Sequence, residues 1–298
     1  MLAHDLLKAG TNEVMVAGGL ESMSNAPYIL PKARSGQRLG HGQMMDHMFL
    51  DGLEDAFDKG TLMGVFAERT AKKYGFSREA QDEFAIRSLT RAKKAIEDGS
   101  FDAEVTPVTY KNRQGEVTVE QDEQPLTANL EKIPKLRPAF DKDGTVTAAN
   151  SSSISDGAAA LVMMSESTAK KRGLKPIARF LGQSSFAQDP AWFTTAPVSA
   201  IRNLLETLGW NADEVDLFEI NEAFAVVTMA AMKDLDLPAD KVNVHGGACA
   251  LGHPVGASGT RILVTLISAL QKYGKTRGVA SLCIGGGEAT AMAVEVLS

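Results

Sequence analysis

The stretch Asn243-Val-His-Gly-Gly-Ala-Cys-Ala-Leu-Gly-His253-Pro-Val-Gly-Ala-Ser-Gly-Thr-Arg261 leads directly into an apolar-periodic segment over residues 262–270. This pattern predicts a glycine-rich loop that feeds a helix. Glycines let the backbone come close to a bound group, and the first N–H groups of a helix point toward whatever lies before it. A residue before proline is kept out of the helical region, so His253 is held in a restricted conformation. Gly-His-Pro alone is equally compatible with a catalytic histidine and with a structural turn whose histidine faces solvent.

Two further segments place polar side chains where strands are expected to end. Cys283-Ile-Gly-Gly-Gly lies between the apolar runs 279–282 and 289–296, which predicts a strand, a glycine turn and a second strand. Asn221 follows residues 216–220, where a predicted strand gives way to a helical pattern. A cysteine among glycines is usually just small and buried, and an asparagine before a helix is usually an N-cap. Because sites in α/β sheets gather beyond the carboxyl ends of strands, the combination with His253 favours a catalytic site.

In this order and spacing, Asn221-Glu-Ala-Phe, the 243–261 stretch and Cys283-Ile-Gly-Gly-Gly resemble the thiolase family, which includes acetyl-CoA acetyltransferases and 3-ketoacyl-CoA thiolases. Residues 16–24 and 135–140 also resemble thiolase segments, and the resemblance covers the whole chain. It implies an α/β fold in which two similar αβα halves stack on each other. An inserted loop domain accompanies them, and the first half is expected to be incomplete.

The resemblance also implies a division of the chain into domains. Lys175-Pro176 is the best boundary, and the strands and helices that alternate after it predict a largely parallel sheet covered on both faces. Before it, residues 13–17 are expected to form a buried strand that Gly18-Gly19 ends. The expected parts are the remainder of the N-terminal domain (1–24 and 144–174), a loop domain that covers the acyl-CoA (25–143), and the C-terminal domain (175–298).

The resemblance assigns catalytic roles to four residues. His253 would activate a nucleophilic thiol and donate to an oxyanion site, and Asn221 would hold a water that completes the other oxyanion site. Cys283 would be the acid/base thiol that takes the α-proton, and Gly285 would add backbone to an oxyanion site. Because a thiol accepts this proton only as a thiolate, we expect the pKa of Cys283 to be drawn toward neutrality by a glycine-turn N–H array or a partner histidine.

Three residues are expected from the resemblance to contact the substrate, namely Ser152 at the pantetheine, Arg137 and Met63. For Ser152, a serine-rich turn without a function is an equally good explanation. Leu62 stands where many acetyl-specific thiolases have histidine, which leaves the acyl chain length open. A loose basic run could receive the nucleotide phosphates, although a solvated charged face is the better explanation for each lysine taken singly. This run consists of Lys111, Arg113, Lys132, Lys135 and Arg137.

Composition narrows the class of protein. The formal net charge of −6 argues against a general nucleic-acid binder. Two cysteines suit a reducing compartment, and no apolar run approaches the roughly 18 residues of a membrane span. We therefore expect a cytoplasmic protein that binds neither nucleic acid nor membrane. The resemblance implies acetyl-CoA, acyl-CoA and free CoA as substrates, with no metal and no cofactor. The resemblance implies a homodimer or homotetramer and a role in fatty acid metabolism, including β-oxidation.

Met1 already lies inside a helical pattern, with no capping residue before it. In thiolases this helix carries the nucleophilic cysteine near its N-terminus, so the chain as written is expected to lack the nucleophile and to be inactive. Cys249 is expected to be a packing residue and no substitute. Three interpretations remain open at this point: an active thiolase whose recorded start is an internal methionine, an inactive fragment that at most binds CoA, and another thiolase-like enzyme such as a ketoacyl synthase.

Overall fold

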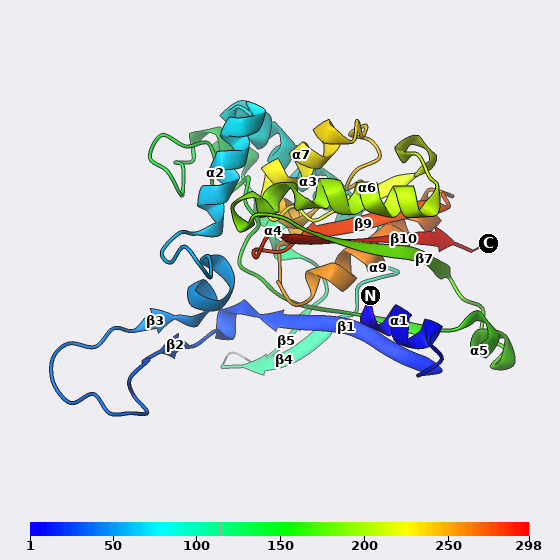
Figure 1. The fold of residues 1–298 in the computed structure, drawn as a ribbon, viewed down its shortest axis with the longest axis horizontal. Helices are drawn as coiled ribbons and strands as arrows, with labels where there is room; N and C mark the ends of the chain where they lie inside the picture. Colours follow the sequence, from blue (N-terminus) through cyan, green and yellow to red (C-terminus); the bar gives the residue numbers. More distant parts are fainter. Residues whose placement is uncertain (114, 298) are drawn as a thin grey trace.

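The computed structural model describes residues 1–113 and 115–297. Figure 1 shows a central sheet with helices on both faces and, below it, a second pair of strands that includes β1. The helices are α1 (Leu2–Lys8), α2 (Met63–Tyr74), α3 (Arg78–Glu97), α4 (Glu123–Thr127), α5 (Glu166–Lys171), α6 (Ala196–Leu208), α7 (Ala225–Asp234), α8 (Ala248–Leu251) and α9 (Ser258–Lys272). Shorter helical segments are η1 (Met23–Asn25), η2 (Phe49–Leu53), η3 (Leu130–Lys135), η4 (Pro190–Thr195) and η5 (Ala212–Glu214). The strands are β1 (Val14–Ser22), β2 (Tyr28–Ile29), β3 (Met45–Asp46), β4 (Val108–Asn112), β5 (Gly115–Val119), β6 (Asp156–Met164), β7 (Ala178–Ala187), β8 (Leu217–Ile220), β9 (Arg277–Cys283) and β10 (Glu288–Val296).

The larger sheet of the described residues has the order β7-β10-β9-β8. Only β8 and β9 are parallel, because β10 runs antiparallel to both β7 and β9. The prediction of a largely parallel sheet is therefore wrong. The short glycine turn between β9 and β10 is the reason, since a tight connection joins only antiparallel strands. Beyond β8, the chain adds a single parallel bridge between Val242 and Phe218.

Helices cover both faces of this sheet. Helix α6 packs against β7, β9 and β10 and places Ile201 and Leu204 in the core, both fully buried. Helix α9 lies against β8 and β9 on the other face, where Leu266 and Leu270 are fully buried. The far side of α9 contacts the antiparallel pair β1 and β6, called the β1–β6 ribbon here. Helix α9, which the 243–261 loop feeds, is thus enclosed between two layers of strands.

Strand β1 departs from its prediction. It runs through Gly18 and Gly19 to Ser22, and its Val16 side chain is 70% exposed, so it is neither short nor fully buried. A Cβ atom on Gly19 would lie 1.8 Å from the carbonyl oxygen of Gly256. This glycine therefore serves a close approach between the ribbon and the loop after His253, and does not end the strand.

Helix ends carry ordinary local signals. Gly75 and Gly209 end α2 and α6 in the left-handed conformation, with φ of 68° and 66°. Ser77 caps α3 by accepting a hydrogen bond from the Ala80 N–H. None of the helices in the described ranges is long and apolar enough to cross a bilayer.

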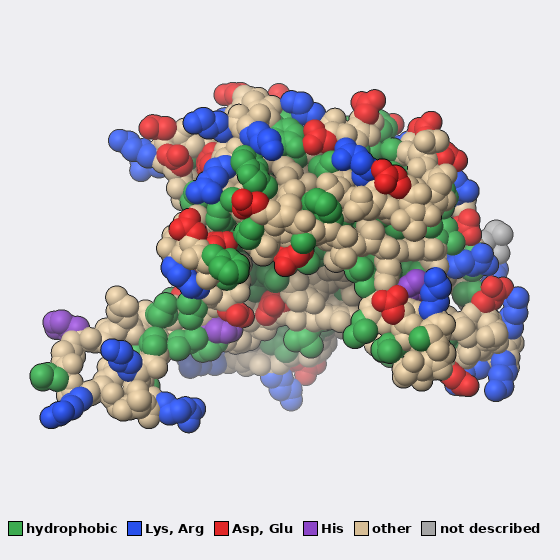
Figure 2. All heavy atoms as spheres, in the orientation of Figure 1, with side chains coloured by type: hydrophobic (Ala, Val, Ile, Leu, Met, Phe, Trp, Pro, Cys, Tyr) green, Lys and Arg blue, Asp and Glu red, His purple; other side chains and the backbone are tan. Residues whose placement is uncertain are grey.

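The segment between β2 and β3 projects from the body of the molecule, at the lower left of Figure 1. In the space-filling view of Figure 2 this projection carries several basic side chains. Lys32, Arg34 and Arg38 are exposed there, and Leu39 is 98% exposed.

Candidate active site

Asn221 and His253 meet where β8 ends. The Asn221 backbone N–H donates to the carbonyl of Ser281 on β9, which fixes the ends of two parallel strands beside each other. The Asn221 side-chain nitrogen lies 3.3 Å from Nε2 of His253, on the glycine-rich loop that leads into α9. Cys283 ends β9 two residues beyond Ser281. The structure thus gathers these side chains at one end of the sheet.

The other ring nitrogen of His253 is held by Ser258, in the first turn of α9. Nδ1 lies 2.6 Å from the Ser258 hydroxyl, which also lies 3.0 Å from the carbonyl of Pro254. When the hydroxyl donates to Pro254, Nδ1–H donates to Ser258 and Nε2 presents a lone pair. When the hydroxyl turns to donate to Nδ1, Nε2 carries the proton. Rotation of one hydroxyl therefore lets His253 offer either a base or a donor at Nε2.

Asn221 is matched to both states of the histidine. Its Oδ1 is buried and has no hydrogen-bond partner among the described residues. The side-chain amide donates to the Nε2 lone pair in one orientation, and after rotation its oxygen accepts from Nε2–H. Burial, and then the charge of Arg261, lower the pKa of His253 to about 4. The imidazole is therefore neutral near pH 7 and able to accept a proton.

Cys283 differs from its prediction. The thiol is 7% exposed, and burial raises its pKa to about 12 in place of drawing it toward neutrality. Two N–H groups of the glycine turn are engaged within the turn itself, because the Ile284 N–H donates to the Glu288 carbonyl and the Gly287 N–H donates to the Ile284 carbonyl. The thiol is therefore neutral in this structure and stands in its proton-donating form.

Apolar side chains enclose the thiol. Cys283 belongs to one buried cluster with Met63, Phe66, Phe193 and Phe224. Met63 also approaches the glycine turn, since a Cβ on Gly285 would lie 3.0 Å from the Met63 sulfur. The structure thus places Met63 and Gly285 together. The sequence analysis did not identify Phe66, whose helical apolar spacing indicates only a core position.

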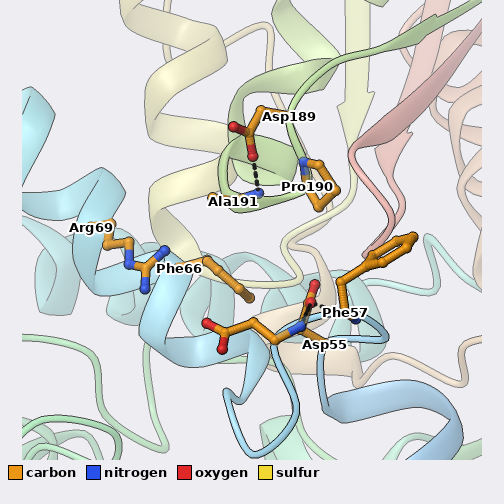
Figure 3. A pocket seen from close by; sticks show the side chains of 8 residues that line it. Asp55, Phe57, Phe66, Arg69, Asp189, Pro190 and Ala191 are labelled. Atoms are coloured by element: carbon orange, nitrogen blue, oxygen red, sulfur yellow. Dashed lines mark hydrogen bonds between the residues drawn. The ribbon is translucent and has the colours of Figure 1, made fainter.

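A cavity of about 440 Å³ adjoins this cluster. Figure 3 shows it between the loop that carries Asp55 and Phe57, the α2 residues Phe66 and Arg69, and the start of η4 at Pro190. The ring of Phe66 packs edge-on against Phe193 at 6.1 Å, and the Arg69 guanidinium lies 4.8 Å from the Phe66 ring centre. Phe66 therefore lines the cavity and also belongs to the apolar cluster that contains Cys283.

Ser152 lies beside the segment that follows Asn221. Its backbone N–H and its hydroxyl both donate to the Ala223 carbonyl, at 3.1 and 3.0 Å. The carbonyl of Asn150 accepts from the Ala225 N–H, so the two segments are linked on both sides of Ser151, which bridges to Phe224. The Ser152 hydroxyl is half-buried at the edge of the site, in a position from which its oxygen can still accept a hydrogen bond.

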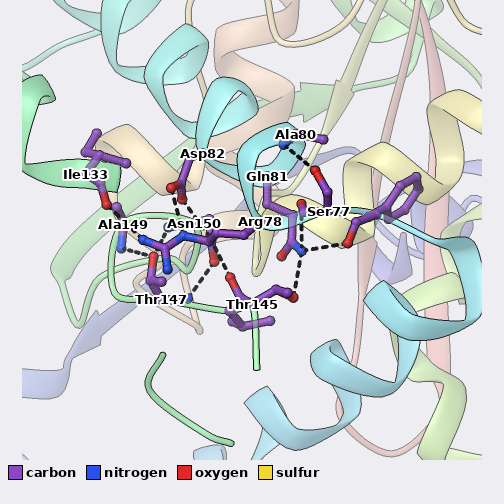
Figure 4. Close-up of polar contacts among 12 residues, drawn as sticks. Ser77, Arg78, Ala80, Gln81, Asp82, Ile133, Thr145, Thr147, Ala149 and Asn150 are labelled. Atoms are coloured by element: carbon purple, nitrogen blue, oxygen red, sulfur yellow. Dashed lines mark hydrogen bonds and ion pairs between the residues drawn. The ribbon is translucent and has the colours of Figure 1, made fainter. Parts of the chain in front are cut away.

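Helix α3 anchors the loop before Ser152, as Figure 4 shows. Asn150 donates to Asp82 and to the Thr145 carbonyl, and its Oδ1 accepts from the Thr147 N–H at 2.7 Å. Arg78 holds Asp82 at 2.7 Å. This buried polar network fixes a loop that sequence alone describes only as polar.

The expected basic run is divided between two exposed segments. Lys111 and Arg113 lie on the β4–β5 hairpin, whereas Arg137 follows η3. Phe140, three residues after Arg137, packs its ring on Phe224 at 6.0 Å.

The second thiol is sealed in the core. Cys249 is 1% exposed, and burial together with nearby Glu222 raises its pKa well above the ordinary value. Its Sγ lies 3.8 Å from the Glu222 carbonyl oxygen. This agrees with the packing role predicted for Cys249. Sequence reasoning passed over Glu222, because nothing in the pattern indicates that its carboxylate is buried.

Comparisons with known proteins agree across the chain. The family description "Thiolase, N-terminal domain" matches residues 1–167, and "Thiolase, C-terminal domain" matches residues 174–296. An acetyl-CoA acetyltransferase of Escherichia coli strain K12 is 50% identical over 299 residues, covering 100% of this chain and 76% of the relative. The crystal structure of the Bacillus anthracis acetyl-CoA acetyltransferase superposes with a TM-score of 0.96 at 46% identity, covering 100% of this chain and 75% of that one. A thiolase from Ascaris suum in complex with coenzyme A gives a TM-score of 0.92 at 43% identity, covering 99% and 75%.

The chain therefore spans about three quarters of the length of these relatives, and they match nearly all of it. This extent of similarity gives no support to the expectation that the chain is inactive.

Proposed function

The chain belongs to the thiolase family, and we propose that it transfers acyl groups between coenzyme A thioesters as an acetyl-CoA acetyltransferase. The reaction is the Claisen condensation of two acetyl-CoA molecules, or in reverse the thiolysis of a 3-ketoacyl-CoA by free CoA. The observation that carries the proposal is the meeting of Asn221 and the neutral, Ser258-held His253 at the end of the sheet, beside the strand that Cys283 ends.

Asn221 and His253 supply the groups that a thioester oxygen needs. As the enolate forms, negative charge develops on that oxygen, and fixed donors in a dry site stabilise it. The Asn221 amide and Nε2–H of His253 are such donors once Ser258 donates to Nδ1. With the proton on Nδ1 instead, the Nε2 lone pair can take a proton from an attacking thiol.

Cys283 donates or removes the α-proton, depending on the direction of the reaction. In thiolysis, an attacking thiol forms a C–S bond to the ketone carbon and passes its proton to the Nε2 lone pair of His253. The bond between the α-carbon and the ketone carbon then breaks, and its electron pair leaves as the enolate of acetyl-CoA. The Cys283 thiol protonates that carbon and becomes a thiolate. Condensation runs the same transfer backward, so that the thiolate removes a methyl proton. Because burial raises the pKa of the thiol to about 12, the neutral acid form is the one ready for thiolysis.

Substrate contacts follow from the surroundings of the thiol. We assign the pantetheine contact to Ser152, the oxyanion backbone to Gly285, and the walls of the acyl site to Met63 and the apolar cluster around Cys283. Exposed Arg137 suits a phosphate of the nucleotide.

A cytoplasmic location and a homo-oligomeric state are also part of the proposal, with β-oxidation as one setting for the thiolysis direction. Two free cysteines fit a reducing compartment. The projecting β2–β3 segment carries the 98% exposed Leu39, which suits contact with a second copy.

The test is exchange of the acetyl-CoA methyl protons with D₂O, followed by NMR, together with acetoacetyl-CoA cleavage in the presence of CoA. We expect exchange by the parent chain, and Cys283→Ala should abolish it. His253→Ala should slow it by about 100-fold or more. Cys249→Ala, at the sealed thiol, is the matched control and should exchange at the parent rate. A parent chain that neither exchanges the methyl protons nor cleaves acetoacetyl-CoA would contradict the proposal. Exchange without cleavage would mean that proton transfer is intact and that the acyl-transfer step is defective.

A further inference from the structure

Glu222 follows Asn221 and turns its carboxylate into the interior, where the residue is 1% exposed. The carboxylate accepts three hydrogen bonds. Oε1 accepts from the Asn243 side-chain nitrogen at 2.8 Å, and Oε2 accepts from the Ser88 hydroxyl at 2.7 Å and from the Cys249 N–H at 3.0 Å. An acceptor with three donors in a dry site is one of the stronger polar arrangements in proteins.

The three donors come from three parts of the chain. Asn243 clamps the end of β8, because its side chain donates to the Ile220 carbonyl and accepts from the Ile220 N–H, both at 2.8 Å. Cys249 lies in α8, the short helix between Gly247 and His253. Ser88 lies on α3 and also accepts from the Gly247 N–H at 2.9 Å. One carboxylate therefore joins the strand end before Asn221, the loop before His253 and helix α3.

Packing leaves this carboxylate little freedom. A Cβ on Gly247 would lie 2.4 Å from the Glu222 carboxyl carbon, so the glycine loop rests directly on the acid. A shift of the carboxylate would move the loop that carries His253 and the strand end that carries Asn221 at the same time.

We propose that Glu222 is a positioning residue, which holds Asn221 and His253 in their mutual geometry and links both to helix α3. The inference rests on the proposed function, because Asn221 and His253 are the groups that it sets in place. Glu222 itself touches neither His253 nor the reacting atoms.

The polarity of the contacts gives a sharp test. A glutamine has one acceptor and one donor, so Glu222→Gln must turn its NH₂ toward either Asn243 or Cys249, and both of these are donors. Rotation of the Asn243 amide cannot restore the lost hydrogen bond, because its oxygen and its nitrogen both hydrogen-bond to the Ile220 backbone. The variant thus keeps the volume of the side chain and breaks one hydrogen bond in either orientation.

The first readout is the titration of the His253 ring by NMR, which is practical in a chain with five histidines. It requires no turnover. In the parent we expect a pKa of about 4, caused mainly by burial and further by Arg261. In Glu222→Gln the loosened loop admits water, so the pKa should rise toward the ordinary 6.5. The second readout is methyl-proton exchange of acetyl-CoA, which should fall by about tenfold or more.

One further variant isolates the cause. Asp216→Asn is the matched control at the opposite end of β8, where the acid accepts from the Thr276 and Arg277 N–H groups. It should lower stability without changing the His253 titration or the exchange rate.

A Glu222→Gln protein with the parent titration and exchange rate would overturn the inference. If Glu222→Gln fails to fold, Ser88→Ala removes one of the three donors and should move both readouts in the same direction by less. Parent behaviour of Ser88→Ala would then count against the inference. A parent without exchange refutes the proposed function alone, since the His253 titration still reports on Glu222.

Discussion

The β7-β10-β9-β8 sheet and the β1–β6 ribbon are both built from small and β-branched residues, but their surroundings differ. In the sheet, helices cover both faces, and Ala289, Ala293 and Val294 of β10 are fully buried. In the ribbon, every second residue of each strand faces outward, and the register pairs Val16 with Val162, which are 70% and 67% exposed. The covered sheet bears the candidate catalytic residues, whereas the ribbon supports them from one side.

The two regions meet at the loop after His253. The Gly256 N–H donates to Glu21 on β1 at 3.2 Å, and a Cβ on Gly157 of β6 would lie 2.8 Å from Pro254. The comparison therefore teaches that the stability of the molecule is concentrated in the sheet and α6, while the ribbon contributes mainly through this narrow contact. Substitutions in the two regions should separate these contributions.

The largest difference is expected from core truncation. Leu204 on α6 is fully buried against the sheet, so Leu204→Ala should lower the free energy of unfolding by about 2–5 kcal/mol. Val162→Ala removes methyl groups that already face solvent and should cost less than about 0.5 kcal/mol. Urea denaturation of both variants measures the pair. Equal losses would show that the ribbon is as strongly packed as the sheet.

The next largest effect is expected at the contact between the ribbon and the loop after His253. Gly19→Ala places a methyl group 1.8 Å from the Gly256 carbonyl oxygen, so backbone must move on one side. We expect a loss of about 1–3 kcal/mol and slower methyl-proton exchange, because Gly256 lies between His253 and Ser258. Gly259→Ala is the control, since its new methyl would meet only Leu282 at 3.9 Å. Unchanged stability and exchange in Gly19→Ala would remove the ribbon from any supporting role.

The same glycine shows where the sequence is informative and where it is not. The Ser77 cap and the Gly75 and Gly209 helix ends are local, so the residues nearby determine them. Gly19 looks like a strand end because its reason lies 237 positions away, at Gly256. Contacts between distant segments leave no periodic trace in the sequence.

The candidate site divides in the same way. The motifs identified Asn221, His253 and Cys283, whose placement at strand ends follows from the strand pattern. The raised pKa of Cys283 could not be predicted, because it depends on a cluster assembled from α2, η4 and the segment before α7. Glu222 was missed for a similar reason, since its donors come from α3 and two loops.

The stability of the covered sheet region is expected to depend on pH through a buried histidine. His245 is 1% exposed beside Phe101 and Tyr273, and burial, with nearby Lys272, lowers its pKa to about 4. The unfolded chain binds a proton near 6.5, so this histidine stabilises the fold above that pH. The contribution is lost as pH falls from about 6.5 to 4 and amounts to about 1–3 kcal/mol.

The stability difference between the parent and His245→Phe, measured at pH 7.5 and at pH 4.5, isolates this effect. Buried Glu219 and Glu104 have raised pKa values and act in the opposite direction, but they are common to both proteins. The parent should lose more stability than the variant on acidification. A difference that does not depend on pH would mean that His245 remains accessible to protons in the fold.

The smallest effect on stability is expected on the open face of the ribbon. Leu20 on β1 is 74% exposed and lies in line with Val16, so Leu20→Lys should leave the unfolding free energy within about 0.5 kcal/mol of the parent. Exposed apolar strands attract other chains, and a lysine there opposes such pairing. Light scattering should therefore show less association at equal stability. If Leu20→Lys instead lowers the unfolding temperature strongly, this face of the ribbon is covered in solution. The difference in exposure between the sheet and the ribbon then holds for the single chain and is absent from its assembly.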